Sequence, residues 1–299
     1  MGSAGHSTRR PVRNRNFCDH NQRFPPISAI RRSVPETNPP LVLIFGPFDP
    51  SGAGSLPADA VTCAALGCHA LSTVTALHVQ DTASVEDIQP VAPETIDDQA
   101  RCLLEDMAVQ AIKIGPLYTA ESASVVAQIA ADYSKVPLVL HLGAMPGAAV
   151  LEDSDPEEAL GATFELLLPQ TDIAIVEHQL LLQWQAEGLL PEVEGGSAAH
   201  ALLQYGARWV LTTATPMRPG LSSYLLQGQR NETHSWPWAA PAARVHDADG
   251  PLACAIAGQL ARGRGVAEAV PAAIEQAAAL SAASFQPGMG QRLIRRSLA

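Results

Sequence analysis

The chain has 299 residues, of which 47% are hydrophobic, 16% charged and 5% aromatic. This composition suits one large α/β domain or two small ones, and it excludes a disulfide-rich miniprotein, a collagen-like repeat and a wholly disordered chain. No uninterrupted apolar run approaches the roughly 20 residues that a membrane-spanning helix needs. The formal net charge of −11 argues against a nucleic-acid-binding protein, because binding to phosphate backbones depends on positive charge.

The charge is distributed unevenly along the chain. Residues 1–39 carry seven arginines and two acidic residues, so the remaining chain has a formal charge of −16. This first segment shows no hydrophobic periodicity and lacks the apolar stretch of a secretory signal. We expect residues 1–40 to form a disordered basic arm. A transit peptide and an over-extended start of the coding sequence are the alternatives.

The cysteines and histidines indicate neither disulfides nor a structural metal. Five cysteines and nine histidines are scattered without the paired spacing of a zinc site. An odd number of cysteines in apolar surroundings is typical of small core residues in a reducing cytoplasm. We therefore expect a cytoplasmic protein.

Strands and helices are expected to alternate from Leu41 onward. The continuous apolar run Leu41–Phe45 predicts a strand that is buried on both faces. A Gly- and Pro-rich turn and a helix over 55–66 follow. Further strands are expected over 70–79, 110–114, 137–141, 172–176 and 208–213, and helices over 94–107, 119–132, 156–168, 178–187, 196–205, 252–263 and 266–283. Residues 221–226 and 234–238 are expected to pair as an edge hairpin. This alternation predicts a mainly parallel sheet within a single domain over 41–299.

Several motifs resemble a known enzyme family. They are Asp49-Pro50-Ser51-Gly52 with Ala58-Asp59, the run T-V-T-A-L-H-V-Q-D-T over 73–82, and V-Q-A-I-K-I-G-P-L over 109–117. The chain resembles the hydroxymethylpyrimidine/phosphomethylpyrimidine kinases of thiamine biosynthesis. The tail Q-P-G-M-G-Q over 286–291 is similar to the end of some proteobacterial members. The similarity is dense over 41–117, thinner over 118–245, and returns over 246–291.

The resemblance implies a ribokinase-like three-layer α/β/α sandwich with a mainly parallel central sheet, usually found as a homodimer. It also implies phosphorylation of the hydroxymethyl group of an aminopyrimidine, with ATP and Mg²⁺. Asp59 and Gln80 match family residues that hydrogen-bond the pyrimidine, and Gly52 lies in the same substrate-binding loop. A carboxylate and an amide can both pair with the edge of an aminopyrimidine. The alternative for Gln80 is a polar residue at a strand end that contacts only backbone.

The phosphate side departs from the family pattern. The family's H-G-[ST]-G-C-[TS]-L-S, which forms an anion hole at a helix N-terminus, corresponds here to His246–Ala253. Asp247 and Asp249 replace the two glycines, and Gly250 stands at the position of the family's catalytic cysteine. A carboxylate about 4 Å from the transferring phosphoryl group would oppose its charge by roughly 4 kcal/mol, about a thousandfold in rate. Asp249, displaced by one residue, is the candidate base.

Other phosphate- and metal-side motifs are altered as well. The family's D-P-V corresponds to His141-Leu142-Gly143, and its N-x-x-E motif retains one carboxylate, Glu177, while Leu180 replaces the other. The nucleotide loop reads T-T-A-T over 212–215, and prolines stand at positions 47 and 116 near the pyrimidine. We expect Lys113, Glu177, Thr213 and Asp247 to form the nucleotide and phosphate region.

Three functions follow from these residues. The first is an aminopyrimidine kinase whose activity is in doubt, and the second is a catalytically inactive pyrimidine-binding or regulatory paralogue. The third is an enzyme with altered chemistry that uses Asp247, Asp249 and His141 as a new polar cluster. His78 and His246 are further ligand candidates, whereas Trp236, Trp238 and Cys254 are interpreted as packing residues.

Overall fold

A parallel sheet forms the centre of the protein in the computed structural model, which describes residues 38–151, 154–241 and 244–296. In this part of the chain nine strands pair in the order β3-β2-β1-β4-β5-β6-β7-β8-β9. Their bounds are β1 Leu41–Phe48, β2 His69–Gln80, β3 Val85–Pro90, β4 Ala111–Ile114, β5 Leu138–His141, β6 Ile173–Glu177, β7 Trp209–Arg218, β8 Leu221–Gly228 and β9 Thr233–Trp238. Strands β2, β1, β4, β5, β6 and β7 run parallel to one another. At the two edges of the sheet, β3 pairs antiparallel with β2, β8 with β7, and β9 with β8.

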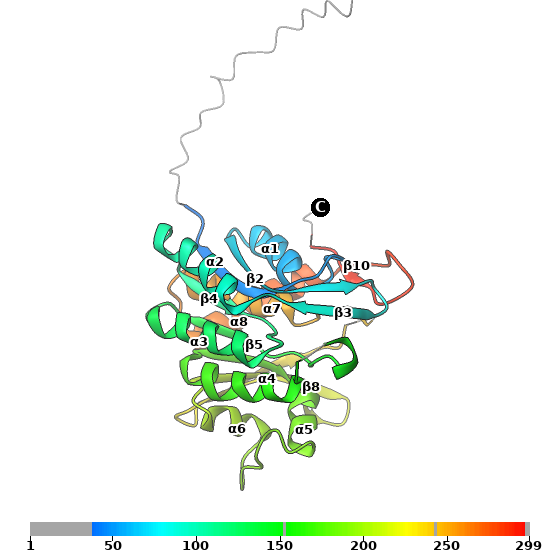
Figure 1. The fold of residues 1–299 in the computed structure, drawn as a ribbon. Helices are drawn as coiled ribbons and strands as arrows, with labels where there is room; N and C mark the ends of the chain where they lie inside the picture. The colour runs from blue at the N-terminus through cyan, green and yellow to red at the C-terminus, as the bar shows by residue number, and fades with distance from the viewer. Residues whose placement is uncertain (1–37, 152–153, 242–243, 297–299) are drawn as a thin grey trace, which may run out of the picture. The chain divides into compact units, whose positions relative to one another are not determined.

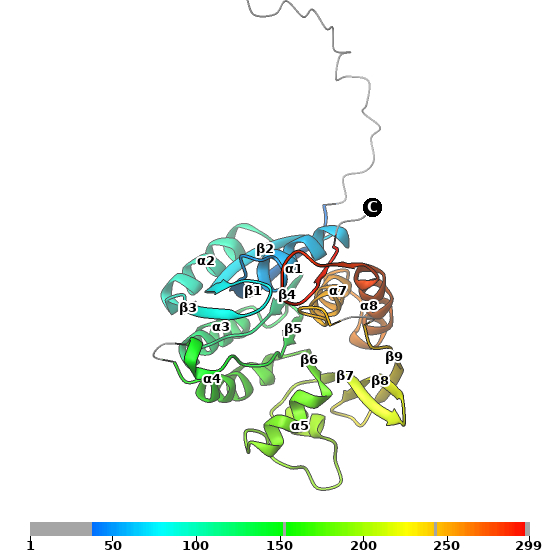
Figure 2. The same cartoon turned by 90° about the vertical axis from the view of Figure 1, so that its right-hand side faces the viewer.

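Helices cover both faces of this sheet (Figures 1 and 2). The α-helices are α1 Ser55–Ala65, α2 Pro93–Asp106, α3 Ala120–Asp132, α4 Pro156–Ala162, α5 His178–Ala186, α6 Ala198–Gln204, α7 Gly250–Ala261 and α8 Val266–Ser281. The short turns η2 Ala148–Val150, η3 Thr163–Leu167 and η4 Leu168–Gln170 complete the helical elements. None of the helices in the described ranges is long and apolar enough to cross a membrane.

Alternating residues of each strand divide the core in two. On β1, Leu43 and Phe45 pack with helices α2 to α6, whereas Val42 and Ile44 pack with α1, α7 and α8. Helix α7 is buried over almost its whole length, as expected of a helix that is apolar on every side. The three-layer α/β/α architecture that the resemblance implied is therefore confirmed, and the described residues from Pro39 onward form one compact unit.

The predicted elements agree with the structure except at the edges. Strand β3 was not predicted, because its two apolar residues, Val85 and Ile88, do not alternate with a period of two and it ends on a proline. Strand β7 extends to Arg218 and forms a hairpin with β8. The arm expected over 1–40 lies, apart from residues 38–40, outside the described residues.

The C-terminal segment crosses the sheet end and holds two loops in place. Strand β10, Ser284–Phe285, pairs with β11, Leu293–Ile294. Between them, the Gln291 amide donates to the carbonyl of Thr82 at 2.7 Å, and the Arg292 carbonyl accepts from the His246 amide at 3.0 Å. The loop before α7 is thereby attached to the end of the chain.

We expect Phe45→Ala to lower the free energy of unfolding by about 3–5 kcal/mol, because the ring is fully buried at the centre of one core layer. Urea unfolding followed by circular dichroism measures this change. Val61→Ala is the control, since Val61 on α1 is 49% exposed and its truncation should cost less than about 0.5 kcal/mol. A similar loss of unfolding free energy in both variants would contradict the placement of Phe45 at the centre of one of the two core layers.

Candidate functional site

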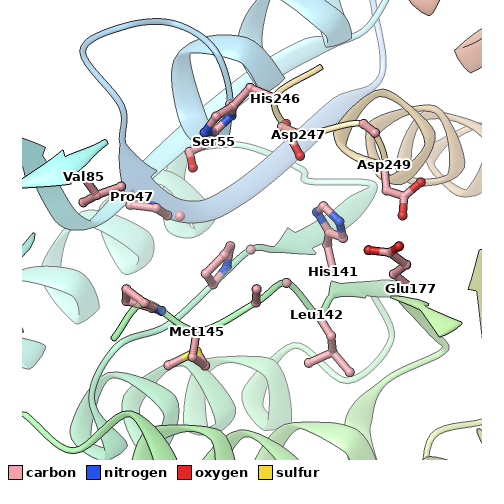
Figure 3. A pocket seen from close by; sticks show the side chains of 18 of the residues that line it. Pro47, Ser55, Val85, His141, Leu142, Met145, Glu177, His246, Asp247 and Asp249 are labelled. Atoms are coloured by element: carbon pink, nitrogen blue, oxygen red, sulfur yellow. The ribbon is translucent and has the colours of Figure 1, made fainter. Parts of the chain in front are cut away.

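A pocket of about 670 Å³ opens at the carboxyl ends of the central parallel strands. This is the edge at which α/β sheets bind ligands. The pocket is lined by the ends of β1, β2, β4, β5 and β6 and by the loop before α7 (Figure 3). Of the residues singled out from the sequence, it brings together Asp59, His78, Gln80, Lys113, His141, Glu177, His246, Asp247 and Asp249.

The β1–α1 loop is shaped by Asp49 rather than by its glycines alone. The buried Asp49 carboxylate accepts from the Ser51 amide at 2.8 Å, the Ser51 hydroxyl at 2.6 Å and the Gly54 amide at 2.9 Å. Gly52 adopts a left-handed conformation with φ of 67°, which glycine permits at little cost. Gly52 shapes this turn but is not among the pocket-lining residues, whereas Gly54 and Ser55 line the pocket.

Asp59 lies at the floor of the pocket, already engaged by two protein groups. Its Oδ2 accepts from Lys113 Nζ at 2.5 Å, and its Oδ1 accepts from the Cys254 thiol at 3.0 Å. Both side chains of the ion pair are almost fully buried. Burial lowers the pKa of Lys113, but the charge of Asp59, together with the smaller effects of Cys254 and Asp247 and the hydrogen bond to Asp59, outweighs burial, and the net pKa is raised. Lys113 therefore stays protonated, and any ligand amine would meet a carboxylate that is already paired.

His141 faces the pocket from the end of β5 as a neutral imidazole. Its burial, reinforced by the positive charge of Lys113, lowers its pKa to about 4. A neutral imidazole offers one donor and one acceptor.

The Asp247 carboxylate lies over the N-terminus of α7. A Cβ added to Gly250, the first residue of that helix, would overlap the Asp247 carboxyl group, and one added to Gly54 would lie 3.3 Å from Asp247 Oδ2. Arg296 approaches Oδ2 at 3.6 Å from the C-terminal segment. Helix N-termini attract anions through free amides and the helix dipole. The protein thus supplies an anion to this helix end from its own chain.

Asp249 occupies the other side of the same loop. Its Oδ2 accepts from the Thr213 hydroxyl at 2.7 Å, and its carboxylate faces that of Glu177 (Figure 3). Burial raises the pKa of Asp249 to about 6, with a further increase from the charge of Glu177 that is opposed by the Thr213 hydrogen bond. Thr213 therefore acts on the site through Asp249, and neither Thr213 nor Gly250 lines the pocket.

These residues do not fit a phosphoryl donor as they stand. The helix end that would cradle phosphate holds the Asp247 carboxylate, and a second carboxylate follows two residues later. Across the described ranges, no group of three or more His, Cys, Asp or Glu is arranged to hold a metal ion. Asp247, Asp249 and His141 share the pocket, but no hydrogen bond joins them.

Two residues of the site were not anticipated from the sequence. Tyr118 lines the pocket and contacts His78, and Arg296 lies beside Asp247 although 48 residues separate them in the chain. Neither belongs to a recognisable motif. Only the return of the C-terminal segment across the sheet end brings Arg296 to the loop.

The buried acids of this loop should make stability depend on pH. Burial, followed by the charge of Asp59, raises the pKa of Asp247 to about 7. A raised folded-state pKa means that the native state binds more protons than the unfolded chain, so stability is lost as pH rises from about 4 through 7. We expect Asp247→Asn to reduce this loss by roughly 2–4 kcal/mol, measured by urea unfolding between pH 4 and 7.5.

The pH dependence of Asp247→Asn is compared with that of the wild type because His141 has the opposite effect on stability. The lowered pKa of His141 makes stability rise with pH over part of this range. Glu105→Gln on the exposed surface of α2 is the control. If the free energy of unfolding depends on pH in the same way in Asp247→Asn and in the wild type, Asp247 is ionised in the folded protein without penalty.

Comparisons with known proteins identify the family of this chain. A family model described as phosphomethylpyrimidine kinase matches residues 49–295. The hydroxymethylpyrimidine/phosphomethylpyrimidine kinase of Streptomyces coelicolor is 30% identical over 258 residues, which cover 86% of this chain and 94% of that protein.

Two solved structures resemble the fold. An ADP complex of Bacillus subtilis pyridoxal kinase matches with a TM-score of 0.73 and 19% identity, covering 87% of this chain and 98% of the other. The phosphomethylpyrimidine kinase of Clostridium difficile matches with a TM-score of 0.64 and 22% identity, covering 81% and 99%. With the family match over most of its length and this fold, the chain belongs to the phosphomethylpyrimidine kinase family and is ribokinase-like in architecture.

Proposed function

We propose that the pocket binds an aminopyrimidine of thiamine biosynthesis, hydroxymethylpyrimidine or its monophosphate. The observation that carries this proposal is the side-chain amide of Gln80, whose Nε2 is buried without a hydrogen-bond partner in the described part of the chain while the residue lines the pocket. A buried donor without a partner costs roughly 1–3 kcal/mol, which a ligand acceptor would recover. Asp59 lies on the same pocket, and family membership supplies the substrate class.

We also propose that phosphoryl transfer from ATP is slow in this protein as it stands. Phosphoryl transfer depends mainly on positioning and on stabilising negative charge, whereas the α7 end of this pocket carries Asp247 and Asp249. Gly250 has no side chain to act as a base. Asp249, with its raised pKa, is the proposed base in a kinase of low activity.

The second candidate function is a catalytically inactive pyrimidine-binding or regulatory protein of the same family. The position of Asp247 over the first residue of α7, beside Arg296, favours it. We propose a cytoplasmic location and a homodimer under either function. They differ in whether ATP enters the site productively.

Thermal-shift measurements with separate ligands and an ATP-coupled assay test these proposals. Hydroxymethylpyrimidine should raise the melting temperature, whereas Mg-ATP alone should not. Turnover should lie far below the ~10 s⁻¹ that is typical of enzymes. Turnover near that value would refute the slow transfer, and the absence of any shift with hydroxymethylpyrimidine and its monophosphate would refute pyrimidine binding.

Removing the Asp247 carboxylate should allow an anionic ligand to bind at the N-terminus of α7. Asp247 has a φ of 51°, a left-handed conformation that glycine adopts without strain, so Asp247→Gly should fold without penalty there. We expect Asp247→Gly to bind Mg-ATP at least about tenfold more tightly than the wild type, because about 1.4 kcal/mol or more of repulsion is removed. Calorimetric titration measures the affinity.

Asp247→Asn is the matched variant, since it removes the charge but keeps the side chain over Gly250. Improved binding in both variants assigns the effect to charge, and improvement in Asp247→Gly alone assigns it to space. If neither variant gains affinity for Mg-ATP, the carboxylate is not what excludes the nucleotide.

A further inference from the structure

A chain of hydrogen bonds runs from Tyr118 through His78 to Gln80 along one wall of the pocket. His78 Nε2 lies 3.1 Å from the Tyr118 hydroxyl, and His78 Nδ1 lies 3.0 Å from Gln80 Oε1. His78 and Gln80 are two residues apart on β2, so they share one face of the strand. All three residues line the pocket.

The protons of this chain follow from the chemistry of each group. Gln80 Oε1 can only accept, so His78 Nδ1 must carry the proton it donates. Burial lowers the pKa of His78, so the ring is neutral near pH 7 and its Nε2 accepts. Tyr118 is 6% exposed, and burial raises the pKa of its phenol. Its hydroxyl therefore keeps its proton and donates it to His78.

The opposite direction of the chain is less favourable once a ligand acceptor meets Gln80 Nε2, the donor that the first direction leaves unpaired among the described residues. If the Gln80 amide were turned over, Nε2 would donate to His78 Nδ1, and His78 Nε2 would donate to the Tyr118 oxygen. The Tyr118 proton would then have no acceptor, because His78 is its only hydrogen-bond partner among the described residues. A buried hydroxyl without an acceptor costs roughly 1–3 kcal/mol.

We propose that His78 and Tyr118 are positioning residues that turn the Gln80 amide so that its Nε2 donor faces the ligand, and that this end of the pocket therefore selects a heterocycle with an unprotonated ring nitrogen. The proposal rests on the proposed aminopyrimidine binding and adds what determines the orientation. Gln80 Nε2, which is buried and has no partner among the residues that the structure describes, is the group that meets the ring nitrogen.

The packing around the chain keeps it in one arrangement. Tyr118 belongs to a small apolar cluster with Ala76, Ile88 and Leu151, and its ring centroid lies 5.5 Å from that of His78. Ile88 is paired with His78 across β2 and β3. Because the rings of His78 and Tyr118 are already packed, they lose little side-chain entropy when they hold the Gln80 amide in one orientation.

Selectivity between ligands tests the proposal, because a merely structural role would weaken all ligands alike. Calorimetric titration of the full chain at pH 7.5 uses hydroxymethylpyrimidine and its two aminopyridine analogues, in each of which one ring nitrogen is replaced by C–H. The wild type should bind hydroxymethylpyrimidine about tenfold or more tightly than one of the two analogues. Tyr118→Phe and His78→Leu should reduce this preference several-fold.

Two variants separate orientation from packing. His78→Asn keeps a donor near Gln80 Oε1 but loses the contact with Tyr118, so it should retain more of the preference than His78→Leu. Gln80→Glu keeps the acceptor that faces His78 and removes the donor, so it should abolish the preference. Leu77→Ala on the exposed face of β2 is the control and should behave as the wild type.

Each outcome decides the proposal. Equal binding of all three ligands by the wild type overturns the inference and leaves aminopyrimidine binding intact. A preference that survives unchanged in Tyr118→Phe and His78→Leu overturns the positioning role. No binding of any of the three ligands overturns the proposed function and the inference together.

Discussion

The Asp59 carboxylate connects three elements at the centre of the molecule. It comes from α1, pairs with Lys113 of β4 and accepts a hydrogen bond from Cys254 of α7. A buried charge is tolerated only when it is paired and hydrogen-bonded, so the two ionised groups require each other. The pocket floor is consequently a rigid ion pair rather than a free carboxylate. The two charges of this ion pair also shift the pKa values of neighbouring groups. Lys113 contributes to the lowered pKa of His141, and Asp59 contributes to the raised pKa of Asp247.

The two ends of the pocket have different chemical characters. At one end, the wall formed by β2 and Tyr118 carries a neutral donor, Gln80 Nε2, and Tyr118 itself belongs to an apolar cluster. At the other end, two carboxylates line the loop before α7, and one of them lies over the helix N-terminus. An unprotonated heterocycle suits the first end, and an anionic ligand must displace or neutralise a carboxylate at the second. This asymmetry is what separates pyrimidine binding from phosphoryl transfer in the proposed function.

The C-terminal segment links the loop before α7 to the rest of the sheet end. Arg292 and Gln291 hydrogen-bond backbone groups of the loops at His246 and Thr82, and Arg296 lies beside Asp247. Two nitrogens of the buried Arg296 guanidinium have no hydrogen-bond partner among residues 38–151, 154–241 and 244–296. Its charge partly offsets the repulsion that Asp247 experiences from Asp59. The surroundings of Asp247 are thus formed by three distant stretches of the chain, namely the loop before α7, the C-terminal segment and helix α1.

Local pattern was sufficient for the layered architecture and for the loops that carry the site. The apolar run at Leu41–Phe45 and the alternation that follows it determined a parallel sheet with helices on both faces, because strands buried on two faces have no polar positions. The motifs around Asp59, Gln80 and Lys113 indicated the family, and the parallel strands indicated the end of the sheet at which a ligand site is expected. Tertiary structure alone decided that Asp59 is paired with Lys113, that Tyr118 meets His78, and that Asp247 covers the first residue of α7. These contacts join residues 40 or more positions apart in the chain, or depend on one left-handed backbone angle. Neither periodicity nor motif spacing records such pairings, since each is set by how separate elements pack.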